Sequence, residues 1–268
     1  MYRTIRNLIS RLFKAFSVIL YYVTGTHIVS QYRIKKLKNI YKGQRIFVVC
    51  NGPSLKPEDL TKIYNAGYKS IGMNQIAYVY PNTPWRVNIL VCTDGCIFWK
   101  KSKKMIQECE ADYKVFNRKD FLTSLSYNGK KIYVHCIGDS ILLDEPKFSE
   151  DLLKKYYCIG TTAYESIEWA RYLGAKEIYL IGCDMSYAVN ANQDGSIYYN
   201  TSGGNHFYEK DKDELSHVKP VQTWQQKLAH RAADDYSRSN GFRIYNATRG
   251  GCLEEYERVD FDSLFGNI

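Results

Sequence analysis

Short apolar runs alternate with amphipathic segments along most of this chain. Runs of four to seven residues, rich in β-branched and aromatic side chains, predict seven strands, at residues 45–50, 69–73, 87–93, 113–116, 131–136, 177–182 and 242–246. Apolar residues at three- and four-residue spacing predict helices at residues 57–66, 97–110, 162–173 and 221–240. Alternation of strands and helices is typical of a mostly parallel sheet covered by helices. We therefore expect an α/β, Rossmann-like fold.

The N-terminal segment has a different pattern. From Ile5 to Val23, apolar residues recur at helical spacing, and polar residues that include Arg6, Arg11 and Lys14 fill the other face. A basic amphipathic helix of this kind lies in the interface of a bilayer. The uncharged stretch 15–30 is too short and too polar to span one. A helix packed on the body or on a second subunit is the alternative, and a signal peptide is disfavoured because no Ala-x-Ala-like site follows Val23.

Charge is distributed unevenly along the 268 residues. The net charge is +9, yet the chain up to Pro57 has eleven Lys or Arg and no Asp or Glu, whereas the remainder is near neutral. A basic arm seeks an anionic surface, and the amphipathic pattern favours a membrane over nucleic acid. We expect an arm at residues 1–43 and a catalytic domain at 44–268, in the cytoplasm at the inner face of the membrane. A homo-oligomer is left open.

The eight Cys form no C-x-x-C pair, and several end apolar runs. They are typical of small buried core residues in a reducing compartment. The five His do not pair with them at ligand spacing, so we expect no zinc site.

The end of the first strand is the strongest local signal for function. Arg45-Ile-Phe-Val-Val-Cys50 predicts a strand buried on both faces, and Asn51-Gly-Pro-Ser-Leu55 ends it. Gly52 and Pro53 force a turn, and Ser54 leads into a helix. A strand that breaks into a small-residue turn and a helix start is where α/β proteins bind phosphate. The turn is neither G-x-G-x-x-G nor a P-loop, which argues against an ordinary dinucleotide site.

Polar residues also follow the other predicted strands or precede a helix. They are Asn74, Gln75, Asp94, Thr161, Thr162, Asp184, Asn246 and Arg249. In a parallel sheet the carboxyl ends of the strands share one edge, where ligands bind. Taken singly, each residue is also an ordinary cap or turn former. Because most of these groups are neutral amides and hydroxyls, the set suits a sugar, a ribose and a base.

The long polar segment 182–218 is predicted to be a lid or acceptor loop. It contains Tyr187 and two histidines, His206 and His217, and a histidine is a natural general base for a sugar hydroxyl. Asp211-Lys-Asp213 has the D-x-D spacing of metal-dependent glycosyltransferases, but it lies within a run of charges that is typical of a solvated face. We expect no metal ligand.

Several of these motifs resemble the bacterial sialyltransferases of glycosyltransferase family 42, over residues 45–250. The likeness consists of Asn51-Gly-Pro-Ser-Leu55, Met73-Asn74-Gln75, Thr161-Thr162-Ala163, Gly174-Ala-Lys-Glu-Ile-Tyr-Leu180 and Gly182-Cys-Asp184. The chain is also similar to the group related to the archaeal 6-hydroxymethylpterin diphosphokinase. That likeness includes Asn205-His-Phe-Tyr208, Asn246-Ala-Thr-Arg-Gly-Gly251 and Arg258-Val-Asp-Phe-Asp-Ser-Leu264.

The sialyltransferase resemblance implies a CMP-linked nonulosonic acid as donor and no metal cofactor. It implies that Asn51, Ser54 and Asn74 hold the nucleotide and that a loop histidine is the base, with His206 favoured over His217. Tyr187 falls one residue after the position of the family's Tyr, which steadies the leaving phosphate. Asp94 stands where that family has an Asn, and Ala163 replaces its Gly. A lipid-linked or surface glycan is the expected acceptor, and inversion the expected outcome.

Two alternatives remain open. The second resemblance implies pyrophosphoryl transfer from ATP, with Mg²⁺ held by Asp94 and Asp184. A non-catalytic module that binds a nucleotide sugar or a glycan is the other.

Overall fold

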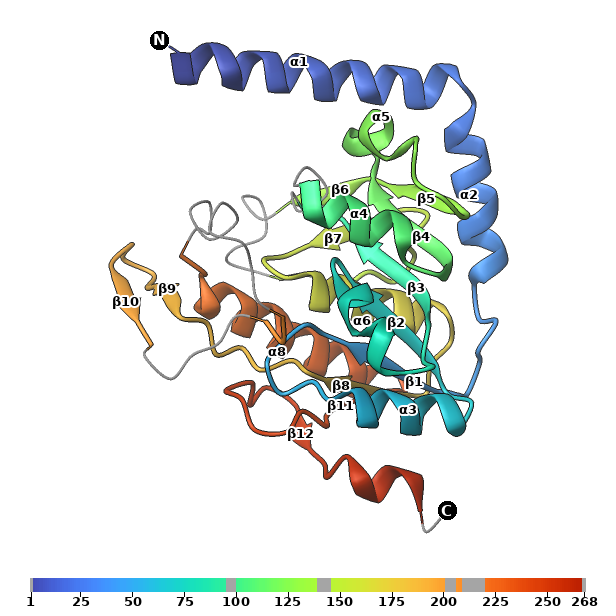
Figure 1. The fold of residues 1–268 in the computed structure, drawn as a ribbon, viewed down its shortest axis with the longest axis vertical. Coiled ribbons are helices and arrows are strands. Elements are labelled where there is room, and N and C mark those ends of the chain that lie inside the picture. The colour runs from blue at the N-terminus through green and yellow to red at the C-terminus, as the bar shows by residue number, and fades with distance from the viewer. Residues whose placement is uncertain (1, 95–99, 139–145, 201–205, 209–219, 267–268) are drawn as a thin grey trace.

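The computed structural model describes residues 2–94, 100–138, 146–200, 206–208 and 220–266. Its centre is a sheet of eight strands in the order β12-β11-β8-β1-β2-β3-β4-β5, and every neighbouring pair is parallel (Figure 1). In chain order the strands are β1 (Arg45–Val49), β2 (Lys69–Met73), β3 (Val87–Cys92), β4 (Ala111–Asn117), β5 (Lys131–Val134), β8 (Glu177–Ile181), β11 (Arg243–Asn246) and β12 (Glu257–Arg258). The α/β, Rossmann-like prediction is confirmed.

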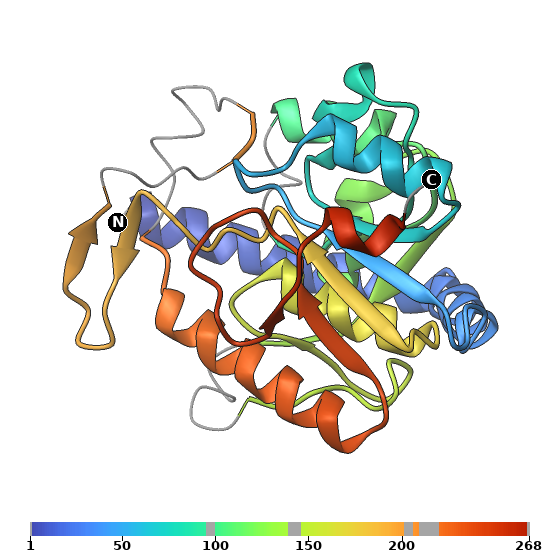
Figure 2. The ribbon, with the colours of Figure 1, turned by 90° about the horizontal axis from the view of Figure 1, so that it is seen from below.

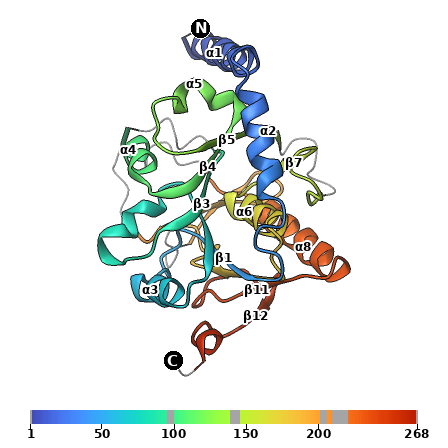
Figure 3. The same ribbon diagram turned by 90° about the vertical axis from the view of Figure 1, so that its right-hand side faces the viewer.

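Helices cover both faces of the sheet, as the edge-on view in Figure 3 shows. On one face lie α2 (Thr26–Leu37), α6 (Thr162–Tyr172) and α8 (Thr223–Ser239). On the other lie α3 (Pro57–Asn65), α4 (Lys100–Glu108), α5 (Phe121–Ser124) and the short helices η1 (Ile76–Asn82), η3 (Arg118–Asp120) and η5 (Asp262–Phe265). Strand β1 is buried on both sides because Ile46 and Val48 face one layer and Phe47 and Val49 the other.

Two small sheets were not predicted. Strand β6 (Cys136–Gly138) pairs with β7 (Tyr156–Cys158), and β9 (Val189–Ala191) forms a hairpin with β10 (Ile197–Tyr199). The predicted strand at 131–136 is broken, since β5 ends at Val134 and β6 begins at Cys136. The hairpin lies within the predicted lid 182–218, of which residues 201–205 and 209–218 fall outside the described part of the chain.

The N-terminal segment consists of α1 (Tyr2–Val23) and α2, with a bend of 74° between them. Helix α1 runs along the β5 end of the molecule and contacts η3 and α5, while α2 descends beside β5 (Figure 1). Ser17 and Tyr21 of α1 are buried. Among the described residues no single helix is long and apolar enough to cross a membrane, although α1 and α2 taken together meet that test of length and composition.

The C-terminal segment closes the opposite end of the sheet, beyond β8, as the view from below in Figure 2 shows. After β11 the chain loops back before β12, and Arg258 holds that loop by hydrogen bonds to the carbonyls of Gly250 (2.9 Å), Gly251 (3.2 Å) and Leu253 (3.2 Å). The backbone N–H of Cys252 donates to the carbonyl of Asp184 at 2.7 Å. The loop therefore supports the turn that comes after β8.

Candidate functional site

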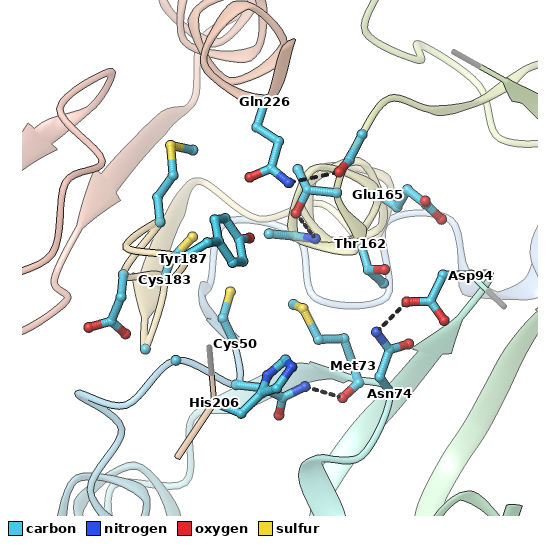
Figure 4. A pocket seen from close by; sticks show the side chains of 18 of the residues that line it. Cys50, Met73, Asn74, Asp94, Thr162, Glu165, Cys183, Tyr187, His206 and Gln226 are labelled. Carbon is cyan, nitrogen blue, oxygen red and sulfur yellow. Dashed lines mark hydrogen bonds between the residues drawn. The ribbon is translucent and has the colours of Figure 1, made fainter. Parts of the chain in front are cut away.

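A pocket of about 430 Å³ lies at the carboxyl ends of the central strands (Figure 4). Strand order reverses here, because β2 follows β1 on one side and β8 pairs with β1 on the other. Open α/β sheets bind ligands at such a switch point. Predicted site residues that line the pocket are Asn51, Gly52, Asn74, Asp94, Thr161, Thr162, Asp184, Tyr187 and His206. The structure thus brings nine of the fourteen predicted residues to one site, and their roles remain predictions.

The turn after β1 is fitted closely against the turn after β8. Ser54 donates to the carboxylate of Asp184 from its hydroxyl (2.8 Å) and from its backbone N–H (3.4 Å). A Cβ on Gly52 would overlap the Asp184 carboxylate and lie 2.5 Å from the carbonyl oxygen of Gly182. Burial raises the pKa of Asp184, and the hydrogen bonds from Ser54 oppose that rise. Ser54 itself does not line the pocket but holds Asp184, which does.

Two pocket residues have an unusual backbone conformation. Asn74, directly after β2, has φ of 51°, and Met185, directly after Asp184, has φ of 50°. Such left-handed conformations are uncommon outside glycine, and for a bulky residue such as methionine they mark strain that the surroundings enforce. Asn tolerates this region better. The strain lies at the pocket on both sides of the switch point.

Two asparagine residues that line the pocket have buried amide oxygens. The amide N–H of Asn51 donates to the carbonyl of Met73 (3.0 Å), and that of Asn74 donates to Asp94 (2.7 Å) (Figure 4). These bonds fix which end of each amide is the oxygen. Both amide oxygens are buried and accept no hydrogen bond from the described part of the chain. Because an unsatisfied buried acceptor is costly, a ligand with N–H or O–H donors would fit this wall.

The N-terminus of α6 forms the opposite wall. Thr161 caps the helix by accepting a hydrogen bond from the N–H of Ala163 (3.3 Å), and Thr162 begins it. Gln226 of α8 holds the preceding turn by donating to the carbonyl of Gly160 at 2.9 Å. The positive end of the helix dipole favours an anion such as a phosphate near this wall.

Glu165, in the first turns of α6, is a pocket residue that the sequence prediction missed. Its carboxylate is buried and accepts a hydrogen bond from Thr93, which also lines the pocket. Burial raises the pKa of Glu165 to about 8, although the bond from Thr93 opposes this. It is therefore a largely neutral acid at pH 7. No clear signal in the sequence marked it, because α6 also contains Ser166, Glu168 and Arg171.

Tyr187 and His206 approach the pocket from the segment after β8. Burial raises the pKa of Tyr187, so its phenol remains a hydrogen-bond donor across the neutral range. The ring of His206 stacks on Tyr208 (5.0 Å between centroids, 6° between planes), and Tyr208 stacks on Tyr78 of η1 (4.6 Å). The N–H of Phe207 donates to the carbonyl of Asn51 at 2.9 Å. These contacts fix the short segment 206–208 beside the β1 turn.

Three predicted residues lie elsewhere. Gln75 is buried and donates to Ser102, because the left-handed turn at residue 74 directs it away from the pocket into the α4 layer. Asn246 is also buried and donates to the carbonyl of Leu253 (2.7 Å), so it organises the C-terminal loop. Arg249 forms two 2.9 Å bonds with Asp59 and a further ion pair with Asp262. His217 and the Asp211–Asp213 motif lie outside the described residues.

One group of side chains beside the pocket has the chemistry to hold a cation. Donor atoms of Cys136, Cys158 and Glu165 lie within 4.8 Å of one another. Burial raises the pKa of each of the three, which keeps them protonated and neutral in the absence of a cation. Zinc accepts thiolates and carboxylates, but its structural sites use four protein ligands. Within the part of the chain that the structure describes, this group supplies three such ligands.

The chain belongs to the MptE-like family, described as 6-hydroxymethylpterin diphosphokinase MptE-like, whose model matches residues 24–190. This confirms the second of the two resemblances. No curated protein matches the chain. Similar solved structures are the MAf glycosyltransferase from Magnetospirillum magneticum AMB-1 (13% identity, 84% of this chain, TM-score 0.49) and the epimerase Mth375 from Methanothermobacter thermautotrophicus (14%, 80%, 0.27). The matches cover 35% and 53% of those chains, and at these scores neither likeness bears on function.

Proposed function

We propose that this protein is a glycosyltransferase that moves a sugar, of the nonulosonic acid type, from a CMP-linked donor to a glycan hydroxyl. The observation that carries the proposal is the chemistry of the pocket wall. Among the described residues that line it there are three amides, five hydroxyls and one imidazole beside three carboxylates, and none is Lys or Arg. Such a wall suits a base, a ribose and a single phosphate, whose charge the N-terminus of α6 can offset.

The amide oxygens of Asn51 and Asn74, which accept hydrogen bonds, support a sugar donor that carries cytidine. An exocyclic amine or ribose hydroxyls would donate to these oxygens, which the rest of the described chain leaves without a donor. The Tyr187 phenol would donate to the phosphate as charge develops on it. Thr161 and Thr162, at the helix start, would position that phosphate.

The proposed reaction is a single inverting displacement. The acceptor oxygen attacks the anomeric carbon as the bond from that carbon to the CMP phosphate oxygen breaks. The acceptor proton passes to the imidazole of His206, and CMP leaves with both electrons of the broken bond. Two observations support His206 in this role: it lines the pocket, and its ring stacks on Tyr208.

Pyrophosphoryl transfer from ATP is the second candidate, and membership of the MptE-like family favours it. Asp94 and Asp184, which line the pocket, would then hold Mg²⁺. The absence of Lys and Arg from the described pocket wall weighs against a triphosphate. A non-catalytic binding module would use the same wall without turnover.

Ligand-induced stabilisation separates these candidates. Thermal unfolding is measured with CMP, UDP, ATP with Mg²⁺, and 6-hydroxymethylpterin. Stabilisation by CMP is expected. Its loss in both Asn51→Ala and Asn74→Ala would show that the nucleotide binds at the wall formed by these two amides. Stabilisation by ATP with Mg²⁺ alone would overturn the proposal in favour of the kinase.

Turnover is then measured with CMP-sialate and a galactose-terminated acceptor. His206→Ala is expected to lower kcat by about 100-fold or more with little change in the KM for the donor. His27→Ala, on α2 and outside the pocket, is the matched control. Full activity in both His206→Ala and His217→Ala would remove the histidine base from the scheme.

A further inference from the structure

The apolar face of α1 points away from the protein. Large apolar side chains along it are exposed by between 45% and 61%, namely Ile5, Leu8, Ile9, Leu12, Phe13, Phe16 and Ile19. At 3.6 residues per turn these seven form one continuous stripe. A helix of a water-soluble domain normally buries such a stripe, and a contiguous exposed apolar patch marks an interaction surface.

The helix is attached to the body through its other face. The N–H of Leu122 donates to the Ser17 hydroxyl (3.1 Å), and the Tyr21 hydroxyl donates to the carbonyl of Tyr133 (3.4 Å). Just beyond, Ser30 of α2 accepts from the N–H of Tyr133 (3.2 Å). The body therefore packs on the face of α1 that contains Ser17 and Tyr21, and the face that contains Leu12 and Phe16 is left exposed. These contacts fix the direction in which the apolar stripe points.

We propose that this stripe lies in the surface of an anionic lipid bilayer. The charges beside the stripe favour an anionic bilayer. Arg6 and Arg11 are exposed, and helical periodicity puts them at the two edges of the stripe, where cations meet lipid headgroups. The arm has no acidic residue, so two stripes from two copies of the chain would bring cations against cations. This inference does not depend on the proposed reaction.

The bend between the helices favours a pair that lies on the membrane rather than crossing it. One face of α1 and one face of α2 are occupied by the body, which cannot enter hydrocarbon. If α1 lies in the plane of the membrane interface, the 74° bend directs α2 away from that plane. Lys35 and Lys36, near the end of α2, then lie about 15 Å from the interface. That exceeds a Debye length at physiological salt, so the charges of α1 supply most of the attraction.

Flotation of the full chain with lipid vesicles tests the proposal. We expect binding to vesicles of phosphatidylcholine with phosphatidylglycerol, weaker binding to phosphatidylcholine alone, and loss of the difference at high salt. Leu12→Asp with Phe16→Asp is expected to lower binding about tenfold or more. Tyr64→Asp, an exposed aromatic residue on α3 far from α1, is the matched control and should bind as the wild type does.

Several outcomes would overturn the proposal. No binding of the wild type to anionic vesicles would do so, as would equal binding by the Leu12→Asp/Phe16→Asp variant. A dimer in solution that this variant dissociates, without vesicle binding, would assign the stripe to a second copy instead. Because Leu12 and Phe16 are exposed, the variant should fold, and its circular dichroism and thermal midpoint should match those of the wild type.

Discussion

Glu165→Gln should make the protein progressively more stable than the wild type as pH rises. The wild-type carboxylate is buried on α6, and its pKa is raised from 4.5 to about 8. Below pH 4.5 the group is protonated in both the folded and the unfolded chain, so it carries no penalty. Between pH 4.5 and 8 the unfolded chain loses the proton and the folded chain keeps it, so the free energy of unfolding falls as pH rises.

The magnitude can be worked out from the shift. One pKa unit corresponds to about 1.4 kcal/mol, so a shift from 4.5 to about 8 amounts to at most about 5 kcal/mol above pH 8. A glutamine does not ionise, and its amide oxygen can accept the same hydrogen bond from Thr93. The difference in stability between variant and wild type should therefore grow from pH 5 to pH 8 and then level off.

Urea unfolding of both proteins at pH 5, 6, 7, 8 and 9 is the assay. The comparison cancels the titration of a buried acid such as Asp120, which is present in both proteins. Glu168 is coupled to Glu165, because the Glu165 charge raises the pKa of Glu168, so the measured difference includes that coupling. Glu108→Gln, at an exposed position on α4, controls for removing a carboxylate and should not reproduce the trend. A difference that stays constant from pH 5 to 9 would refute the reasoning, because Glu165 would then ionise in the folded protein as it does in the unfolded chain.

Three further substitutions test how the pocket is supported. Gly52→Ala should lower stability by about 1–3 kcal/mol and abolish CMP-induced stabilisation, because the new methyl group overlaps the Asp184 carboxylate; an unchanged melting curve would contradict this. Ser54→Ala removes a 2.8 Å bond to Asp184 and should cost about 1–2 kcal/mol in urea unfolding at pH 7, with Ser54→Thr as the matched control. Arg249→Met should lower the free energy of unfolding by about 3 kcal/mol, because it leaves the buried Asp59 carboxylate without its partner. Adding Asp59→Asn should restore much of that loss, and additive losses in the double variant would argue against the pairing.

Most of the sheet was predictable because its strands are apolar runs with clear endings. The prediction for Arg45–Val49 succeeded because a strand buried on both faces needs apolar residues at every position, and Gly52 and Pro53 mark its end. Strand β12 was missed, since it has two exposed residues, Glu257 and Arg258, and is held by its pairing with β11 rather than by its own composition.

The site was predictable for residues whose place at the end of a parallel strand determines the edge of the sheet on which they lie. Asn51, Asn74 and Asp184 each come just after a parallel strand, and parallel strands end at one edge. Sequence spacing could not show that Arg249 pairs with Asp59, because the two are 190 residues apart and meet only through packing of the C-terminal loop on α3.

Glu165 and the orientation of α1 could not be predicted for a related reason. Periodicity identifies an apolar stripe, but it does not say whether the stripe faces the body or solvent. For α1, long-range bonds to Ser17 and Tyr21 decide the matter. Burial of Glu165 likewise depends on strands β6 and β7, which the sequence pattern did not predict.

The C-terminal loop has a consequence for where the functional unit ends. The family match stops at residue 190, but the sheet continues beyond it with β11, which pairs with β8 and shields what would otherwise be an open edge. Gln226 and the Cys252 N–H, which steady the walls of the pocket, also come after that point. A fragment trimmed to the matched residues would therefore lack part of the pocket wall and the strand that covers β8.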